Sequence, residues 1–285
     1  MPATDLPITF YGKLYFGLVG GLAIICFIAD FVGDLRKVSH TRQLPLPPWK
    51  IGWVDFMLFI VYTLLGVIFI TSLVALTQRI FPAIAAAETW LTIINSAGSH
   101  LTIILAAYLC VRYFPLAFNL KSETPAEKRR HPVVAALIFF FAALPLVGGV
   151  NLAWTGALTW LASLGLADPP TQQATVTLVA GITDPWGYCG MAITAVILAP
   201  ISEELLFRGC LYRFLKGKLN PLLAVTIAAF LFALLHAHTT TFLPLFCLGL
   251  LLCRCYEKSG ELSVCIGFHA LFNLNTFIAL QFMNP

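Results

Sequence analysis

The stretch Ala199-Pro-Ile-Ser-Glu-Glu-Leu-Leu-Phe-Arg-Gly209 lies within a hydrophobic segment, Tyr188–Leu215, that is long enough to cross a membrane. It places two glutamates and an arginine inside that segment. Ionisable side chains at membrane depth are costly and occur mainly where they act. The same half of the chain later carries His236, His269 and Asn273. We therefore expect a membrane-embedded site built from carboxylates, imidazoles and an amide.

The composition of the whole chain also indicates a membrane protein. It is 59% hydrophobic and 11% charged, with a mean hydropathy of +0.88, which is too apolar for a soluble domain of 285 residues. Backbone polar groups must be paired within lipid, so we predict an all-α, polytopic helical bundle of about eight transmembrane helices. The predicted spans are Leu14–Gly33, Trp53–Leu76, Trp90–Val111, Val133–Trp154, Tyr188–Leu215, Pro221–Thr240, Phe242–Tyr256 and Leu262–Met283.

Basic residues are unevenly distributed among the predicted loops. All of the 17 Lys and Arg residues except Lys13 and Arg79 lie in or beside the odd-numbered loops. By the positive-inside rule those loops are cytoplasmic, and both termini lie on the non-cytoplasmic side. We therefore predict an integral, multi-pass membrane protein, in the plasma (inner) membrane if the source is bacterial.

The formal net charge of +4 follows from this loop bias. The sequence contains no basic run interleaved with aromatic residues and no Gly-rich phosphate loop. We therefore expect membrane lipid, and no nucleic acid, among the partners of the chain.

The chain divides into parts within one integral membrane domain. Residues 1–160 hold about four N-terminal transmembrane helices, residues 161–187 an external connecting segment, and residues 188–285 the membrane core that carries the site. The connecting segment has no Lys or Arg, as an external segment should. His100, in the third predicted span, stands among small polar residues and is interpreted as a hydrogen-bonded packing histidine.

Helical spacing gives the two adjacent glutamates different roles. Neighbours on a helix point about 100° apart, so Glu203 and Glu204 cannot face the same partner. Glu204 and Arg208 are four residues apart, share a face and are expected to pair. Glu203 has Phe207 at the corresponding position and no cation in reach on its own helix. We therefore predict that Glu203 is the carboxylate available as a proton-accepting base.

His236 is the expected partner of Glu203 from the next helix. If the two helices are antiparallel neighbours, Glu203 lies roughly 20 Å and His236 roughly 22 Å from the cytoplasmic ends of their helices, so the two are at similar depth. Phe232, four residues before His236, shares its face and is expected to pack beside the imidazole ring. His238 points elsewhere and is expected to be a bystander.

The last predicted helix presents an imidazole and an amide toward one point. His269 and Asn273 are four residues apart, the arrangement that an oxyanion hole requires. Counting from Gly260 places His269 only roughly 14 Å from the cytoplasmic end of its helix. The difference from the depth of Glu203 requires a tilted helix or a different helix start.

Three motifs follow one another on these consecutive hydrophobic segments. Glu203-Glu-Leu-Leu-Phe-Arg208 matches EExxxR, Phe232-Ala-Leu-Leu-His236 matches FxxxH, and His269-Ala-Leu-Phe-Asn273 matches HxxxN. In this order the chain resembles the CAAX protease and bacteriocin-processing (CPBP, or Abi) family of glutamate intramembrane proteases, related to the type II CAAX prenyl endopeptidases. The resemblance covers roughly residues 188–283.

The resemblance implies an intramembrane endopeptidase with assigned residue roles. Glu203 and His236 would activate a water molecule, and His269 and Asn273 would hold the oxyanion. The residues with supporting roles would be Glu204, Arg208 and Phe232.

The resemblance implies a membrane-associated or lipidated peptide or protein as substrate: a prenylated C-terminus, a leader peptide or a membrane peptide signal. It implies no cofactor, and the sequence contains no His-Glu-x-x-His pair. Zinc held by Glu203, His236 and His269 is the less favoured alternative.

Two further functions remain open at the level of the sequence. Buried polar residues also bridge membrane helices, so a non-proteolytic scaffold of the same family is one alternative. A proton-coupled transporter with a Glu–His relay is a second alternative. Transporters commonly contain internal repeats, and none is visible in this sequence.

Overall fold

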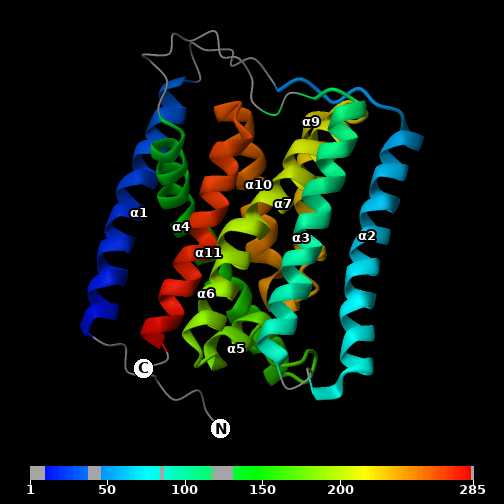
Figure 1. Ribbon diagram of the computed structural model, residues 1–285. Coiled ribbons are helices and arrows are strands. Elements are labelled where there is room, and N and C mark those ends of the chain that lie inside the picture. Colours follow the sequence, from blue (N-terminus) through cyan, green and yellow to red (C-terminus); the bar gives the residue numbers. More distant parts are fainter. Residues whose placement is uncertain (1–9, 38–45, 84–86, 117, 119–130, 284–285) are drawn as a thin grey trace.

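The computed structural model describes residues 10–37, 46–83, 87–116, 118 and 131–283, and this part of the chain is helical without strands. The predicted all-α helical bundle is therefore confirmed (Figure 1). The helices, with π-helical segments written η, are α1 (Phe10–Lys37), α2 (Trp53–Ile80), α3 (Glu88–Tyr113), α4 (Pro132–Ser163), α5 (Ala174–Gly181), α6 (Pro185–Ile193), η3 (Thr194–Leu198), α7 (Ala199–Glu204), η4 (Leu205–Tyr212), α8 (Arg213–Lys216), α9 (Pro221–Leu234), α10 (Thr239–Ser259) and α11 (Leu262–Met283).

Seven helical segments are long and apolar enough to cross a membrane, with α6 to α8 counted as one segment. Their length and composition support an integral, multi-pass membrane protein. The start of α1 and the end of α11 lie at the same end of the bundle (Figure 1). The side of the membrane on which they lie stays a prediction. The third-loop basic residues in 119–130 are outside the described residues.

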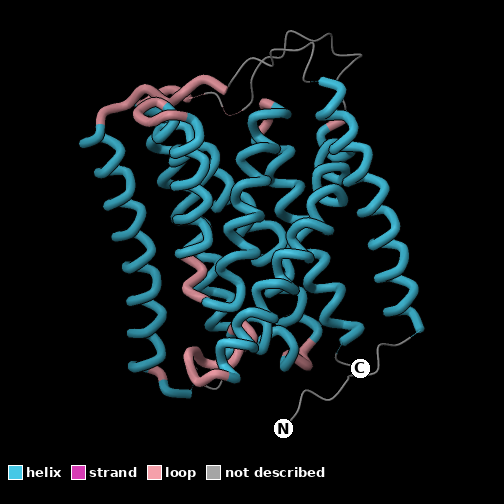
Figure 2. The backbone as a smooth tube through the Cα atoms, turned by 180° about the vertical axis from the view of Figure 1, so that it is seen from behind, coloured by secondary structure: helices cyan, strands magenta, loops and turns pink. Residues whose placement is uncertain are grey.

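The sixth and seventh predicted spans differ from the structure. Helix α9 begins at Pro221, capped by Asn220, and ends at Leu234 after 14 residues, so it is too short to span a bilayer alone. Ala237 then adopts a left-handed backbone conformation with φ 48°, and α10 begins at Thr239. The continuous helix predicted to Thr240 is therefore wrong, because it breaks just before His236. Figure 2 shows a loop part-way through the bundle.

The helical segment that carries the two glutamates runs obliquely through the bundle, from α6 through α7 toward α9 (Figure 1). Its start is fixed by the Asp184 carboxylate, which accepts hydrogen bonds from the backbone N–H groups of Trp186 and Gly187. Two π-helical segments, η3 and η4, flank the short α7. A tilted helix gains less depth per residue, so Glu203 lies nearer to the depth of His269 than a straight helix would place it.

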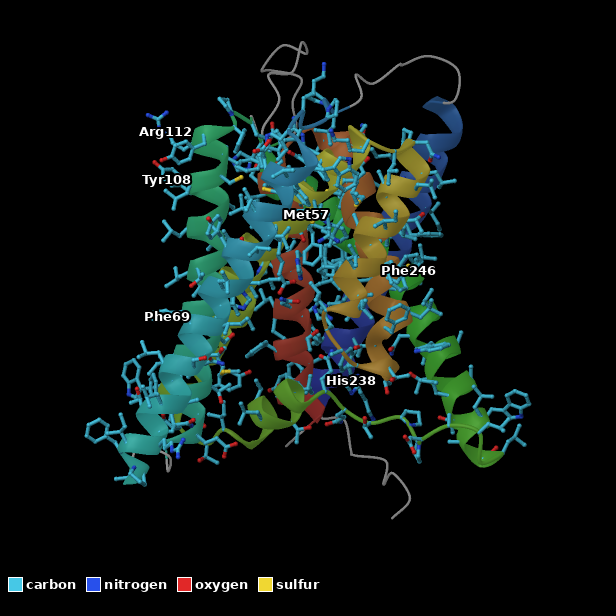
Figure 3. All side chains as sticks on the ribbon, turned by 90° about the vertical axis from the view of Figure 1, so that its right-hand side faces the viewer. Met57, Phe69, Tyr108, Arg112, His238 and Phe246 are labelled. Atoms are coloured by element: carbon cyan, nitrogen blue, oxygen red, sulfur yellow. The ribbon has the colours of Figure 1, made fainter. Side chains whose placement is uncertain are left out.

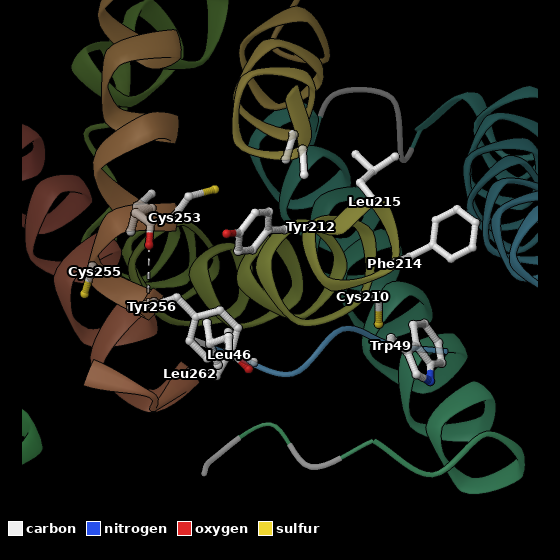
Figure 4. Packing of buried hydrophobic residues seen from close by; sticks show 14 of the residues in the cluster. Leu46, Trp49, Cys210, Tyr212, Phe214, Leu215, Cys253, Cys255, Tyr256 and Leu262 are labelled. Atoms are coloured by element: carbon white, nitrogen blue, oxygen red, sulfur yellow. Dashed lines mark hydrogen bonds between the residues drawn. The ribbon is translucent and has the colours of Figure 1, made fainter. Parts of the chain in front are cut away.

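The segment before α2 is held against the end of this helix. The Trp49 N–H donates to the Arg213 carbonyl at 2.9 Å, and the Arg213 Nε donates to the Pro47 carbonyl at 2.8 Å. Leu46 and Trp49 are both buried, with Trp49 near Cys210 of η4 and Leu46 beside Tyr256 of α10 (Figure 4). This packing fixes one end of the helix that carries the glutamates.

The outer helices expose apolar side chains, as expected for lipid-facing surfaces. Helix α2 lies at one edge of the bundle beside α3 (Figures 1 and 2). Phe69 on α2 and Tyr108 on α3 are largely exposed and extend away from the bundle (Figure 3). Buried polar groups, in contrast, are concentrated on the central helices.

Candidate active site

A fully buried ion pair forms the base of the candidate site. The Arg208 Nη1 lies 2.7 Å from the Glu204 Oε1, and the two side chains are 1% and 0% exposed. The same Glu204 oxygen lies 2.8 Å from the His269 Nδ1 on α11. The predicted pair of Glu204 and Arg208 is therefore present, and it also fixes one face of the His269 ring.

The guanidinium of Arg208 is surrounded by groups that suit a buried cation. Its Cζ lies 4.3 Å from the centroid of the Phe232 ring, a cation–π contact. Its Nη2 donates to the Gly249 carbonyl at 3.3 Å. A side chain at Gly249 would meet Ala229 at 2.9 Å, so the absence of a Cβ allows α10 to approach α9 closely. Phe232 thus supports the ion pair as well as packing beside His236.

Glu203 has no hydrogen-bonding partner for one of its carboxylate oxygens. Its Oε2 is buried without a partner in the described part of the chain and lies 3.8 Å from the His269 Nε2. That separation is too long for a direct hydrogen bond, so the Oε2 remains available to a water molecule or a reacting group. The Glu204 Oε2 is also buried without a hydrogen-bond partner among the described residues, but the Glu204 carboxylate is paired with Arg208, so Glu203 is the carboxylate without an arginine or lysine partner there.

His236 follows the end of α9, and its Nε2 has no hydrogen-bonding partner among the described residues. Its Nδ1 lies 2.7 Å from the Phe232 carbonyl. A carbonyl only accepts, so Nδ1 carries the proton and, in the neutral ring, Nε2 carries the lone pair. The ring also contacts Phe232, with centroids 4.9 Å apart, as the spacing predicted. No direct hydrogen bond or ion pair joins His236 to Glu203 within the residues that the structure describes.

Asn273 is fixed by a backbone group that Pro200 leaves free. Within η3 the hydrogen-bonding register is shifted by one residue, as the bond from the Ala199 N–H to the Thr194 carbonyl shows. The next donor in that register would be Pro200, which has no N–H. The Ala195 carbonyl instead accepts from the Asn273 Nδ2 at 2.7 Å. The second amide hydrogen of Asn273 can serve another acceptor.

The structure thus brings Glu203, Glu204, Arg208 and His269 into direct contact or close approach, with Phe232 linking them to His236. Asn273 contacts the same helical segment one turn before α7.

His238 lies away from these groups, near Thr171 and Thr241. Among the described residues, no group of three or more His, Cys, Asp or Glu side chains is arranged to hold a metal ion. The expectation of a site without a cofactor stays a prediction.

The sequence interpretation missed a contact from the first half of the chain. The His100 Nδ1 lies 2.7 Å from the hydroxyl of Ser202, the residue beside Glu203. On the same helix, the Asn95 Oδ1 is buried without a partner among the described residues. The polar run from Asn95 to His100 inside an apolar span was the available indication, because such residues usually face the interior of a bundle.

The comparisons with known proteins locate the similarity within this region. Neither a curated protein nor a solved structure gives a significant match to the chain. The resemblance to the CAAX prenyl endopeptidases is confirmed by a family match. The match covers less than half of the chain, and this part carries all three motifs. Residues 185–275 match the family described as Type II CAAX prenyl endopeptidase Rce1-like.

Proposed function

We propose that the chain is an intramembrane endopeptidase that hydrolyses a peptide bond of a membrane-associated or lipidated peptide or protein. The observation that carries this proposal is the buried Oε2 of Glu203, which has no hydrogen-bonding partner among the described residues. This oxygen lies 3.8 Å from the His269 Nε2. Glu203 itself belongs to a helical segment long and apolar enough to cross a membrane. A buried acceptor without a donor is costly and calls for a bound water or substrate group. The family match to residues 185–275 supports a protease of the CAAX type.

In the proposed reaction, Glu203 accepts one proton from a water molecule that also donates a hydrogen bond to His236. The water attacks the scissile carbonyl, and the proton held by Glu203 passes to the amine that leaves when the peptide bond breaks. The His236 Nε2 suits the role of acceptor because the Phe232 carbonyl holds the proton on Nδ1. Glu204 pairs with Arg208 and contacts the His269 Nδ1, so its role in this proposal is to orient His269.

His269 and Asn273 would stabilise the oxyanion that forms on the attacked carbonyl. When His269 carries both protons, Nδ1–H donates to Glu204, and Nε2–H is directed to the side where Glu203 lies. One amide hydrogen of Asn273 is donated to the Ala195 carbonyl, and this bond fixes the orientation of the amide. The second amide hydrogen would then be donated to the oxyanion. Fixed donors of this kind can be worth about a hundredfold to a thousandfold in rate each.

The test compares new peptide termini in membranes from cells that produce the wild type or a site variant at equal levels. Glu203→Gln retains the shape of the side chain and removes the base. His236→Asn retains a donor to the Phe232 carbonyl and removes the hydrogen-bond-accepting nitrogen. His238→Gln is the matched histidine control, since the His238 ring hydrogen-bonds to Thr171 and Thr241 and not to the residues of the candidate site.

We expect a set of termini that is lost in Glu203→Gln and in His236→Asn and retained in His238→Gln. These termini would also identify the bond that is cleaved. Identical termini in the wild type and Glu203→Gln would refute the proposal and favour a non-proteolytic scaffold.

A further inference from the structure

A buried hydrogen bond joins the glutamate-bearing helix to α3, which lies outside the family-matched region. Ser202 is fully buried, and its Oγ lies 2.7 Å from the His100 Nδ1 and 3.0 Å from the Ala199 carbonyl. A carbonyl can only accept, and when the Ser202 hydroxyl proton is directed to Ala199, the His100 Nδ1–H is the donor to the Ser202 Oγ. In either tautomer a single hydrogen bond joins His100 to Ser202.

The position of this bond matters because α7 is short and lies between two changes of register. It contains six residues, with η3 before it and η4 after it. π-helical segments interrupt the regular pairing of a helix and frequently mark functional sites. The regular α-helical hydrogen bonding is therefore interrupted on both sides of α7. Contacts from other helices then fix how α7 is rotated about its own axis.

Those contacts come from two helices. From α11, His269 holds Glu204, and Asn273 holds the Ala195 carbonyl. From α3, His100 holds Ser202, directly before Glu203 in the chain. Within the described part of the chain, Ser202 makes no other side-chain hydrogen bond to α3.

We propose that His100 is a positioning residue for Glu203, acting through the hydroxyl of Ser202. This inference rests on the proposed role of Glu203 as the base. It extends the working site to α3, in a part of the chain that the family match does not cover. A histidine that served packing alone would affect stability and leave the turnover of the folded protein unchanged.

The variants separate these two roles. His100→Ala removes the donor, whereas His100→Asn places an amide N–H at nearly the position of Nδ1. Ser202→Ala removes the acceptor. Ser99→Ala is the matched control on α3, because the Ser99 hydroxyl donates to the Asn95 carbonyl of its own helix at 2.8 Å.

The kinetic test uses purified protein and a quenched fluorogenic peptide that carries the bond identified by the terminus comparison. We expect His100→Ala to lower kcat about tenfold to a hundredfold with KM nearly unchanged, the effect of a misplaced catalytic group. His100→Asn should restore most of the loss. The double variant His100→Ala/Ser202→Ala should be no slower than the slower single variant, because both act through one bond. A wild-type kcat in His100→Ala, no rescue by Asn, or additive losses would each overturn the proposal.

A second measurement requires no substrate. Backbone hydrogen exchange of residues 199–204 should be faster in His100→Ala and Ser202→Ala than in the wild type, and unchanged in Ser99→Ala. Unchanged exchange in His100→Ala would overturn the positioning role. If Glu203→Gln cleaves like the wild type, the proposed function fails, and the exchange measurement still decides whether His100 fixes the turn.

Discussion

Removal of the Arg208 charge tests whether the buried ion pair supports the site. Arg208→Met retains most of the side-chain volume and leaves the Glu204 carboxylate without its cation at 0% exposure. Two unit charges about 4 Å apart interact by about 4 kcal/mol at an effective dielectric constant of about 20. Breaking a buried pair by removing one partner costs a similar amount, about 3–5 kcal/mol. We expect the free energy of unfolding to fall by that amount.

The double variant Glu204→Gln/Arg208→Met removes both charges and provides the comparison. The new amide at this position would still present an oxygen to the His269 Nδ1–H, which lies 2.8 Å from the present Glu204 carboxylate. Replacing both partners of a buried pair is often nearly neutral. We therefore expect the double variant to be more stable than Arg208→Met by about 2 kcal/mol or more.

The assay is unfolding in mixed detergent micelles by added SDS, followed by circular dichroism. Arg79→Met is the control, because Arg79 is exposed at the end of α2, and its loss should change the stability by less than about 0.5 kcal/mol. A loss below about 1 kcal/mol in Arg208→Met, or a double variant less stable than the single one, would refute the reasoning.

Two further variants test the packing around the site by the same unfolding assay. Asn273→Leu should lower the free energy of unfolding by about 1–3 kcal/mol, because the Ala195 carbonyl loses its donor; a variant as stable as the wild type would show that this bond contributes nothing. Gly249→Ala should cost about 1–3 kcal/mol, since the added Cβ would lie 2.9 Å from Ala229. Gly148→Ala, which meets nothing within 4 Å, should not destabilise, and equal effects of the two would argue against the close approach of α9 and α10.

Features that depend on spacing along one helix could be predicted from the sequence. The pair of Glu204 and Arg208 is one example, and the contact of Phe232 with His236 is another. In each case four residues separate the partners, and helix geometry places such side chains on one face whatever surrounds the helix. The lack of a local partner for Glu203 followed from the same reasoning.

The end of α9 could not be predicted from apolar composition. The segment remains hydrophobic up to Leu235, and the helix stops at Leu234 because the chain turns at Ala237. A left-handed residue there has no sequence signature, since alanine favours helix. The tertiary structure places His236 after the end of α9. There the Phe232 carbonyl, which accepts from the His236 Nδ1, orients the ring.

The sequence by itself determined that this is a helical membrane protein with a charged site in its second half, because lipid admits few solutions for polar backbone and side-chain groups. It also determined which side chains share a helix face. Only the tertiary structure decided that His269 binds Glu204, that Asn273 serves the carbonyl left free by Pro200, and that His100 reaches Ser202. These contacts depend on the tilt, rotation and register of whole helices, which are set by the packing of the entire bundle.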